Sequence, residues 1–339
     1  LYSTSASITS ESVLTDGRTY YAKFKVQSYT ITVNPDNATT GTTISGWYSA
    51  AGTAASTQTI KTSTEIIMVY GSTVTMTAPQ KTGYTFGGWE KITGAGTLTS
   101  STGTSTFNCG AGDATIKAKW TAKVYTITFL PNGGSVNPTS KTFTIESTIE
   151  LPTPTKDSYV FDGWLVTTAE GNWTNGTLYT DSSIPAGKYG NVTVTAQWHK
   201  TVTVHFYSGS KGAVHNQFQI TFKNNETAGS VKSPASFGTI DGWTALGWTA
   251  STAASKAVGD AAIKGGTAIT VAPAKNEYVY YAVYTQSQTL KYESNANGDT
   301  SVKNIPANGT LAGAYYNSSD AKLNITRTIP STVPTRNGY

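Results

Sequence analysis

Residues 83–89 read Gly-Tyr-Thr-Phe-Gly-Gly-Trp. Tyr84 and Phe86 are two residues apart, so their side chains project from the same face of a strand. The glycine before Trp89 permits a bulge or bend that turns the large indole onto the same apolar layer. The stretch therefore predicts a strand that places three aromatic side chains in one core.

The pattern recurs along the chain. Residues 158–164 read Ser-Tyr-Val-Phe-Asp-Gly-Trp, residues 242–248 read Gly-Trp-Thr-Ala-Leu-Gly-Trp, and residues 41–47 are a weaker copy. A second pattern, an alanine flanked by aromatic residues, ends β-prone runs at Ala22, Ala118, Ala196 and Ala282. Because these features return every roughly 80 to 95 residues, the sequence predicts a tandem array of small modules.

The recurring aromatic residues are best explained as core. Side chains that return with the repeat serve the packing of each module, so we assign them a structural role rather than a ligand. The aromatic residues of this structural motif are Tyr84, Phe86, Trp89, Trp120, Tyr159, Phe161, Trp164, Trp198, Trp243 and Trp248.

The composition favours strands. Of the 339 residues, 37% are hydrophobic and 13% charged, with 20 Tyr and 8 Trp. Strict alternation, as in Tyr-Thr-Ile-Thr-Phe at residues 125–129, is typical of half-buried strands. We therefore predict a mostly β fold with little helix, limited to one short helix over residues 253–264.

The sequence offers little sign of chemistry. Cys109 is the single cysteine, and the three histidines lack metal-ligand spacing, so we predict no metal, cofactor or disulfide. Neither a Gly-x-Ser-x-Gly nor a His-Glu-x-x-His motif occurs, so we predict no catalytic residues and no enzyme. A hydrolase would need two carboxylates across a cleft, and the 19 acidic residues are spread too thinly to place such a pair.

Charge and hydropathy exclude two classes of partner. The net charge is only +5, from 24 basic and 19 acidic residues, which does not favour a nucleic acid partner. No run of 18 apolar residues occurs, so we expect no membrane insertion of this segment.

Some aromatic residues lie outside the repeat pattern. Trp173 stands in a Gly- and Asn-rich stretch, and Tyr315 and Tyr316 are adjacent near the C-terminal end of the sequence. Exposed aromatic faces stack on sugars and other flat ligands. We therefore name Trp173, Tyr315 and Tyr316 as the possible ligand-facing residues.

Residues 124–198 resemble a known family. In order, they contain Tyr-Thr-Ile-Thr-Phe, Asn-Gly-Gly, Pro-Thr-Lys, Tyr-x-Phe-Asp-Gly-Trp and x-Ala-x-Trp, which is similar to the Listeria–Bacteroides repeat that includes the internalin B-repeat. Residues 28–120 and 201–286 are similar but carry longer insertions. The resemblance implies β-grasp-like modules, a bacterial cell-surface or extracellular setting, and no known catalytic residues.

The resemblance and the repeat period together predict the domain organisation. We expect repeat modules at 28–122, with an insertion, at 123–200, the best match, and at 201–286, a divergent copy. Residues 1–27 match the C-terminal half of a repeat and residues 287–339 the N-terminal half, since residues 336–339 read Arg-Asn-Gly-Tyr, like the start of the motif. A half-repeat cannot bury its own apolar face, so we expect it to contact a neighbouring repeat or a second chain.

Two functional hypotheses follow. The first is a non-enzymatic structural segment of a large bacterial extracellular protein, acting as a stalk or as the building unit of a filament. The second is an adhesin module that binds glycans or a host protein through its loop aromatics. The expected partners are neighbouring repeats of the same chain, a second copy through the half-repeats, and, for the adhesin, glycans or host proteins.

Overall fold

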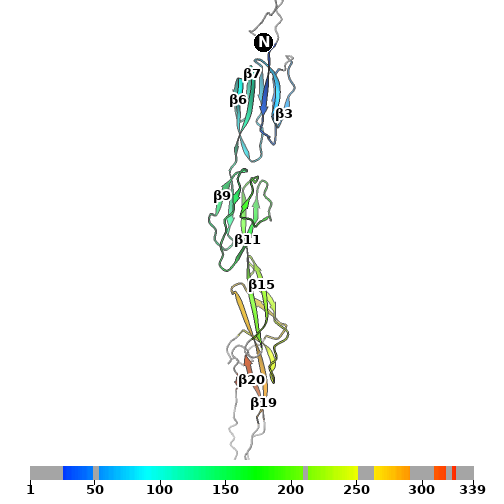
Figure 1. Cartoon of the computed structure of the whole chain (residues 1–339), viewed down its shortest axis with the longest axis vertical. Coiled ribbons are helices and arrows are strands. Elements are labelled where there is room, and N and C mark those ends of the chain that lie inside the picture. Colours follow the sequence, from blue (N-terminus) through cyan, green and yellow to red (C-terminus); the bar gives the residue numbers. More distant parts are fainter. Residues whose placement is uncertain are drawn as a thin grey trace, which may run out of the picture. The chain divides into compact units, whose positions relative to one another are not determined.

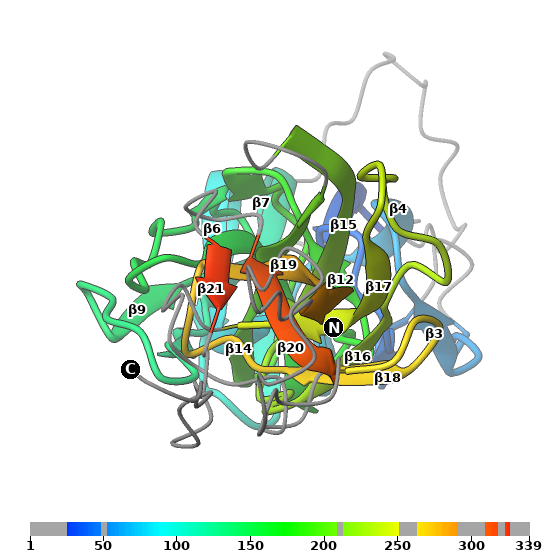
Figure 2. The same ribbon diagram turned by 90° about the horizontal axis from the view of Figure 1, so that it is seen from below.

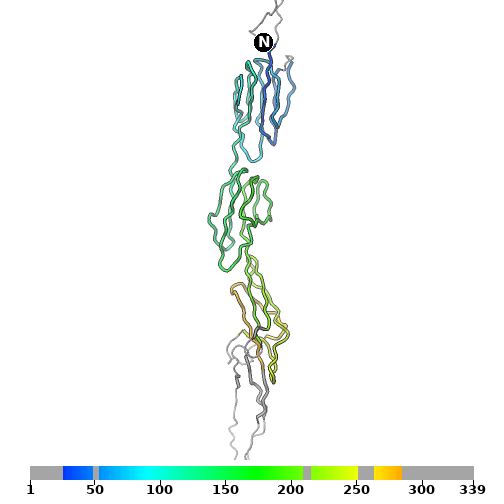
Figure 3. The backbone as a smooth tube through the Cα atoms, viewed as in Figure 1, coloured from blue at the N-terminus to red at the C-terminus, as the bar shows by residue number. Residues whose placement is uncertain are grey.

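A computed structural model describes residues 26–48, 53–208, 213–250, 263–290, 309–317 and 323–325 (Figures 1 and 3). All regular elements within these ranges are strands, which confirms the mostly β class. None of the described residues forms a helix that could span a membrane. The helix expected over residues 253–264 lies almost wholly outside the described residues, as do most of the two expected half-repeats.

The described chain divides into two compact units. The first comprises residues 1–130, 137–152 and 165–195, and the second comprises residues 131–136, 153–164 and 196–339. The long strand β14 and its neighbours contribute to both.

Residues 28–122 form one sheet within the first unit. Its strands are β1 (Ser28–Asn34), β2 (Thr42–Ser45), β3 (Gln58–Ile60), β4 (Thr64–Val69), β5 (Thr73–Met76), β6 (Tyr84–Thr99) and β7 (Ser105–Ala122). They follow the order β3-β2-β5-β7-β1-β4, and β6 pairs with β7. The alternation of apolar residues along β1 and β7 buries Ile31, Val33, Phe107 and Ile116 together with Trp89 in one core cluster.

The pairing of β6 with β7 shows how Trp89 reaches this core. The register shifts between Phe86 and Trp89, where Phe86 pairs with Trp120 and Trp89 pairs with Ala118. Gly88 adopts a φ of 95°, a left-handed conformation that favours glycine. The bend expected before the motif tryptophan is therefore present in this copy.

The remaining strands follow along the chain. They are β8 (Tyr125–Leu130), β9 (Ser140–Phe143), β10 (Ile149–Glu150), β11 (Val160–Ala169), β12 (Leu178–Tyr179), β13 (Ser183–Ile184), β14 (Val192–Ser208), β15 (Ala213–Lys223), β16 (Gly229–Lys232), β17 (Thr244–Thr249), β18 (Ala268–Val271), β19 (Glu277–Leu290), β20 (Gly309–Asn317) and β21 (Leu323–Ile325). One sheet contains β12-β11-β14-β19-β20-β21 in that order, and β8, β15 and β17 pair onto it.

Two small antiparallel pairs lie outside the large sheets. These are β10 with β13, and β16 with β18. The labels of β16 and β18 lie next to each other in Figure 2. Val231 of β16 and Ile269 of β18 belong to a core cluster of the second unit that also contains Phe206, Trp248 and Tyr284.

Among the strand pairs whose register the structure describes, three are parallel. β1 pairs with β7 from Ile31 opposite Ala114, β8 pairs with β14 from Ile127 opposite Val192, and β14 pairs with β19 from Thr203 opposite Glu277. The other strand pairs for which the register is described are antiparallel, for example β1 with β4 and β8 with β9. In each parallel pair the two strands are far apart in sequence, so a long stretch of chain connects them.

Candidate functional site

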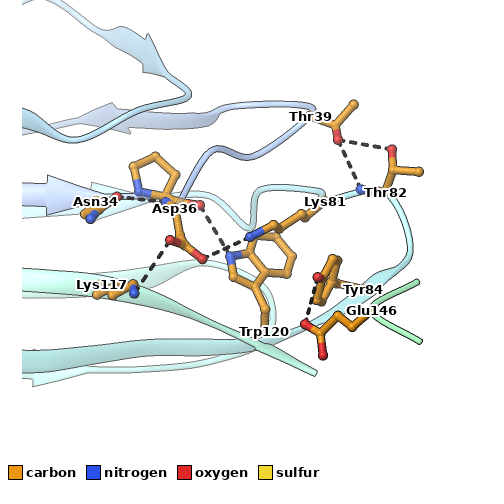
Figure 4. Close-up of polar contacts among 10 residues, drawn as sticks. Asn34, Asp36, Thr39, Lys81, Thr82, Tyr84, Lys117, Trp120 and Glu146 are labelled. Carbon is orange, nitrogen blue, oxygen red and sulfur yellow. Dashed lines mark hydrogen bonds and ion pairs between the residues drawn. The ribbon is translucent and has the colours of Figure 1, made fainter. Parts of the chain in front are cut away.

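The most distinctive cluster of side chains surrounds the start of β6 (Figure 4). Lys81 lies in the turn that leads into this strand, Tyr84 begins it, and Trp120 comes from the end of β7. The Lys81 Nζ atom is 4.9 Å from the centroid of the Tyr84 ring and 5.9 Å from that of the Trp120 ring. We call Lys81, Tyr84 and Trp120 the first lysine–aromatic corner.

Asp36, which follows β1, anchors the cation of this corner. Lys81 Nζ donates a hydrogen bond to Asp36 Oδ2 at 3.0 Å, and Lys117 Nζ lies 3.6 Å from Asp36 Oδ1. The hydrogen bond from Lys81, with the positive charges of Lys81 and Lys117, lowers the pKa of the Asp36 carboxyl although its burial opposes this. These contacts therefore favour the carboxylate form of Asp36.

The aromatic rings are fixed by their neighbours. Trp120 Nε1 donates a hydrogen bond to the Pro35 carbonyl oxygen at 3.3 Å. The Phe86 ring packs between the two indoles, 5.4 Å from Trp120 and 5.9 Å from Trp89 between ring centroids. The corner therefore joins the cation to the buried core of the same sheet.

The second unit contains a matching corner. Lys156 Nζ lies 4.3 Å from the Tyr159 ring centroid and 5.9 Å from that of Trp198. Trp198 Nε1 donates to the carbonyl oxygen of Pro131 at 2.9 Å, as Trp120 does to Pro35. Phe161 lies 5.5 Å from Trp164 and 5.4 Å from Trp198 between centroids. One difference is the anchor, because Lys156 donates to the carbonyl oxygen of Asn132 rather than to a carboxylate.

An open groove adjoins the first corner. It has a volume of about 530 Å³, and its walls include Thr39, Gln80, Lys81, Tyr84, Thr102 and Trp120. The Thr39 hydroxyl oxygen accepts a hydrogen bond from the Thr82 backbone amide at 3.0 Å and lies 3.1 Å from the Thr82 hydroxyl oxygen, which closes one end of the turn. The groove thus combines hydroxyl and amide groups with aromatic rings.

The first corner also contacts the following part of the first unit. The Tyr84 hydroxyl donates a hydrogen bond to Glu146 Oε1 at 2.8 Å. This hydrogen bond is the main cause that raises the pKa of Tyr84, and its partial burial is a smaller one. Gly83 has a φ of 79°, and a Cβ atom placed on it would lie 2.7 Å from Ile145 Cδ1. Glycine at this position is therefore required both by the backbone and by the close approach of Ile145.

Trp173, which we expected to be exposed to a ligand, is buried in the structure. Its side chain is only 6% exposed, and its Nε1 donates to the Gly190 carbonyl oxygen at 3.0 Å. The ring packs edge-on against Phe143 and Tyr179, with centroids 5.9 and 6.1 Å away. Residues from three separate segments thus enclose the indole.

The structure places the other named aromatic residues as follows. Four motif tryptophans are buried, namely Trp89, Trp164, Trp198 and Trp248. The remaining motif residues are half-buried, namely Tyr84, Phe86, Trp120, Tyr159, Phe161 and Trp243. Tyr315 and Tyr316 lie in β20 opposite Thr285 and Tyr284, and their side chains fall outside the described part of the structure.

The lysines of the two corners were missed by sequence reasoning. Both occur in the pattern Pro-x-Lys-x-x-Tyr, at residues 79–84 and 154–159, directly before the aromatic motif. The signal was therefore present, but nothing in the spacing alone shows that the cation folds back over the ring. In the part of the chain that the structure describes, no three His, Cys, Asp or Glu side chains come together as metal ligands would.

The Listeria–Bacteroides repeat domain matches residues 59–119 and 125–197, so both lysine–aromatic corners lie within or at the edge of the matched regions. Internalin H from Listeria monocytogenes serovar 1/2a is 37% identical over 126 residues, which cover 37% of this chain and 21% of that protein. A putative Gly-rich membrane protein from Evansella cellulosilytica is 36% identical over 160 residues, covering 43% of this chain and 16% of that protein.

The alignments thus span about a fifth or less of each relative. The resemblance inferred from the motifs of residues 124–198 is confirmed by the second matched region. Residues 59–119 and 125–197 of this chain are Listeria–Bacteroides repeat domains.

Proposed function

We propose that this chain is a non-enzymatic structural segment of a bacterial surface or secreted protein, in which tandem repeats carry tension as a stalk or fibre. The relatives support a surface setting, since one is an internalin and another is described as a membrane protein. In this proposal the repeats are β-grasp-like modules at 28–122, 123–200 and 201–286. The names first, second and third repeat refer to these ranges below.

The proposal rests on the parallel pairing of the first and closing strands of each repeat. In each repeat the first strand is the parallel neighbour of the closing strand: β1 of β7, β8 of β14, and β14 of β19. Tension along the chain pulls the start of the first strand and the end of the closing strand in opposite directions. Because the two strands are parallel, this force acts along their length and shears the ladder, so that its hydrogen bonds are loaded together.

An antiparallel hairpin responds differently to the same force. When β1 and β4 are pulled apart at the end where Ser28 faces Val69, their ladder opens one residue pair at a time. Each step then breaks only one or two hydrogen bonds, each with a net worth of about 1 kcal/mol. The parallel arrangement of terminal strands is therefore suited to a protein that resists stretching.

Force spectroscopy on the full chain with defined attachment points tests this proposal. Handles at Ser28→Cys and Lys123→Cys load the β1–β7 pair in shear, whereas handles at Ser28→Cys and Tyr70→Cys open the β1–β4 hairpin. Cys109 is buried and burial raises the pKa of its thiol, so it does not compete for the handles. We expect a clearly higher unfolding force for the first pair of handles at the same loading rate.

The two geometries share β1 and the same sheet, so each is the control for the other. Equal forces, or a higher force for the hairpin geometry, would contradict a tension-bearing role. A bulk unfolding curve in urea for both double variants checks that neither substitution pair has altered stability by itself.

The groove beside the first corner supports a second candidate function, that of an adhesin. Its volume of about 530 Å³ is in the range of small-ligand sites, and hydroxyl groups beside aromatic rings are the chemistry that binds saccharides. In this proposal the ligand lies against Tyr84 and Trp120 rather than against Trp173.

A glycan array with the full chain tests the adhesin. Thr102→Trp fills the groove with a large side chain, and Thr104→Trp places the same side chain on the same exposed turn but outside the groove walls. A glycan that binds the parent chain and the Thr104 variant, but not the Thr102 variant, would support this function. An array without binding would exclude it for the glycans tested.

A further inference from the structure

We propose that Lys156 and Lys200 of the second repeat bind a phosphate group beside the Tyr159 ring. We call Lys156, Tyr159 and Trp198 the second lysine–aromatic corner. Two carboxylates contact the first corner, whereas no carboxylate in the described part of the chain forms an ion pair or hydrogen bond with the second. The inference is independent of the tension-bearing role proposed above.

The first missing carboxylate is the one that anchors the lysine. Asn132 follows Pro131, and Asp36 follows Pro35, and in each repeat the proline carbonyl oxygen accepts the hydrogen bond from the corner tryptophan. Both residues have a left-handed backbone, with a φ of 51° for Asn132 and 57° for Asp36. The acid that pairs with two lysines in the first repeat is therefore replaced by a neutral amide in the second.

The second missing carboxylate is the one that contacts the tyrosine. Tyr84 and Tyr159 each lie three residues after the lysine of their corner. The Tyr84 hydroxyl donates to Glu146 at 2.8 Å. Among the residues that the structure describes, none forms a hydrogen bond with the Tyr159 hydroxyl. The second corner thus lacks counterparts of both acidic side chains that contact the first.

The second corner also has an additional cation. Lys200 lies two residues after Trp198, at the place that Ala122 has in the first repeat. Its Nζ atom is 5.6 Å from the Tyr159 ring centroid, and that of Lys156 is 4.3 Å from the same point. Because a lysine has a flexible four-carbon stem, both ammonium groups can turn toward one anion at the edge of this ring.

Lys200 is buried to a degree that is rare for a lysine, with only 7% of the residue exposed. It alternates along β14 with the buried residues Trp198 and Val202, so its stem lies on the apolar face of this strand. Within the described ranges its Nζ atom forms no ion pair or hydrogen bond. A largely buried cation without a counter-charge costs free energy, which the binding of an anion would offset.

The acidic side chains nearest in sequence are engaged by other groups. Asp157 Oδ2 accepts a hydrogen bond from the Ser158 hydroxyl at 3.3 Å, and Asp162 pairs with His199. Neither carboxylate forms an ion pair with a lysine of the described structure. An external anion can therefore approach without displacing an internal ion pair.

The groups at this site favour phosphate over carboxylate. Two ammonium groups and one phenolic hydroxyl supply only hydrogen-bond donors and positive charge, which suits a dianion with several oxygens. The corner has no arginine, the residue whose planar fork matches a carboxylate. Inorganic phosphate and a phosphate monoester present the same group, so both belong to the proposed ligand class.

Isothermal titration calorimetry of the full chain with inorganic phosphate tests the site, at an ionic strength held constant with sodium chloride. We expect saturable binding that Lys200→Met weakens at least tenfold. Lys223→Met is the matched control, because this exposed lysine lies on the neighbouring strand β15 opposite His199, and it should leave binding unchanged. Absence of binding to the parent chain, or an equal loss in both variants, would overturn the inference.

A second variant leaves both lysines in place. Asn132→Asp gives the second corner the carboxylate that Asp36 supplies in the first, at a position with the same backbone conformation. We expect at least tenfold weaker phosphate binding, because the new carboxylate competes for Lys156. An unchanged affinity would contradict the proposed site. Thermal melting of every variant checks that it folds like the parent.

Binding should also appear as stabilisation of the fold. A ligand that binds only the folded chain raises its stability by mass action. The urea midpoint of the parent chain should therefore rise with phosphate concentration at constant ionic strength, while that of Lys200→Met stays level. An equal rise in the two proteins would show that phosphate acts elsewhere on the chain and would count against the inference.

Glycerol 2-phosphate distinguishes the two sources of the phosphate group. If this monoester binds within about threefold of inorganic phosphate, the site accepts phosphate groups carried by larger molecules. If inorganic phosphate binds and the monoester does not, the site is supported as one for the free ion. Neither result bears on the proposed stalk, which the pulling experiments test separately.

Discussion

At the scale of single residues, the lysine–aromatic corner explains why a cation precedes each Tyr-x-Phe motif. Lys81 contributes an ion pair to Asp36 and lies over two rings, and Lys156 repeats the ring contacts with a backbone carbonyl as its anchor. The pattern Pro-x-Lys-x-x-Tyr therefore marks a structural contact between the lysine and the tyrosine ring.

Lys81→Met should destabilise the first repeat by about 1–2 kcal/mol, because it removes both the ion pair and the cation–π contacts. The stability is measured by urea unfolding of the full chain, followed by tryptophan fluorescence. Lys119→Met is the control, since this exposed lysine lies on the same closing strand and should change stability by less than about 0.5 kcal/mol. Equal effects of the two substitutions would show that the corner contributes nothing specific.

The lowered pKa of Asp36 predicts a dependence of stability on pH. Because the pKa is lower in the folded than in the unfolded chain, the ionised carboxylate stabilises the fold above its ordinary pKa, which is 3.8. This contribution is lost as the pH falls below that value and through the folded-state pKa. The urea midpoint of the parent chain should therefore fall more steeply under acid than that of Asp36→Asn. Parallel curves for the two proteins would contradict the assignment.

Gly83→Ala should destabilise the contact with the second repeat by about 2 kcal/mol, through a strained φ and the clash with Ile145. Adding Ile145→Ala should restore the share of the lost stability that is due to the clash, but not the share that is due to the strained φ of residue 83. A double-mutant cycle of urea unfolding free energies separates these two shares. Gly103→Ala is the control, because its φ is not left-handed and the nearest atom to its Cβ is 3.6 Å away. No coupling between residues 83 and 145 would contradict the contact.

At the scale of strands, the recurring sequence patterns predicted much of the fold. The spacing of Tyr84, Phe86 and Trp89 indicated a strand with a bend, and the structure has a register shift there with Gly88 in a left-handed conformation. The alternation of residues 125–129 likewise predicted β8. These features were predictable because they depend on neighbours along the chain.

Features that depend on distant segments were not predictable. Trp173 looked like a loop residue, but Phe143, Tyr179 and Gly190 enclose it from three other segments. The parallel partners of β1, β8 and the later half of β14 are also far away in sequence. Nothing in the sequence around Asp36 or Glu146 indicates that these side chains contact Lys81 and Tyr84.

The buried position of Trp173 yields a prediction at this scale, because the indole joins β9 and β12 to the stretch before β14. Trp173→Ala should lower the stability of the second repeat by about 3–5 kcal/mol, as expected for removal of a buried tryptophan. Near-ultraviolet circular dichroism and urea unfolding measure this loss. A variant with unchanged stability would show that the side chain is not part of the core.

At the scale of the whole molecule, the proposal depends on repeats that each resist force on their own. Two of the core clusters support this separation, since one draws only on residues 31–118 and another only on residues 202–284. Each cluster is closed by its own pair of parallel strands, β1 with β7 in one and β14 with β19 in the other. Repeats in series can then be added without redesign of those already present.

The most direct test of the central claim is to pull the full chain by its two ends and record force against extension. We predict a series of separate force peaks, with increases in contour length near 300 Å for repeats of 80 to 95 residues at about 3.6 Å per residue. A single event that releases the whole chain, or a gradual extension at low force without peaks, would contradict the claim that these repeats bear tension one by one.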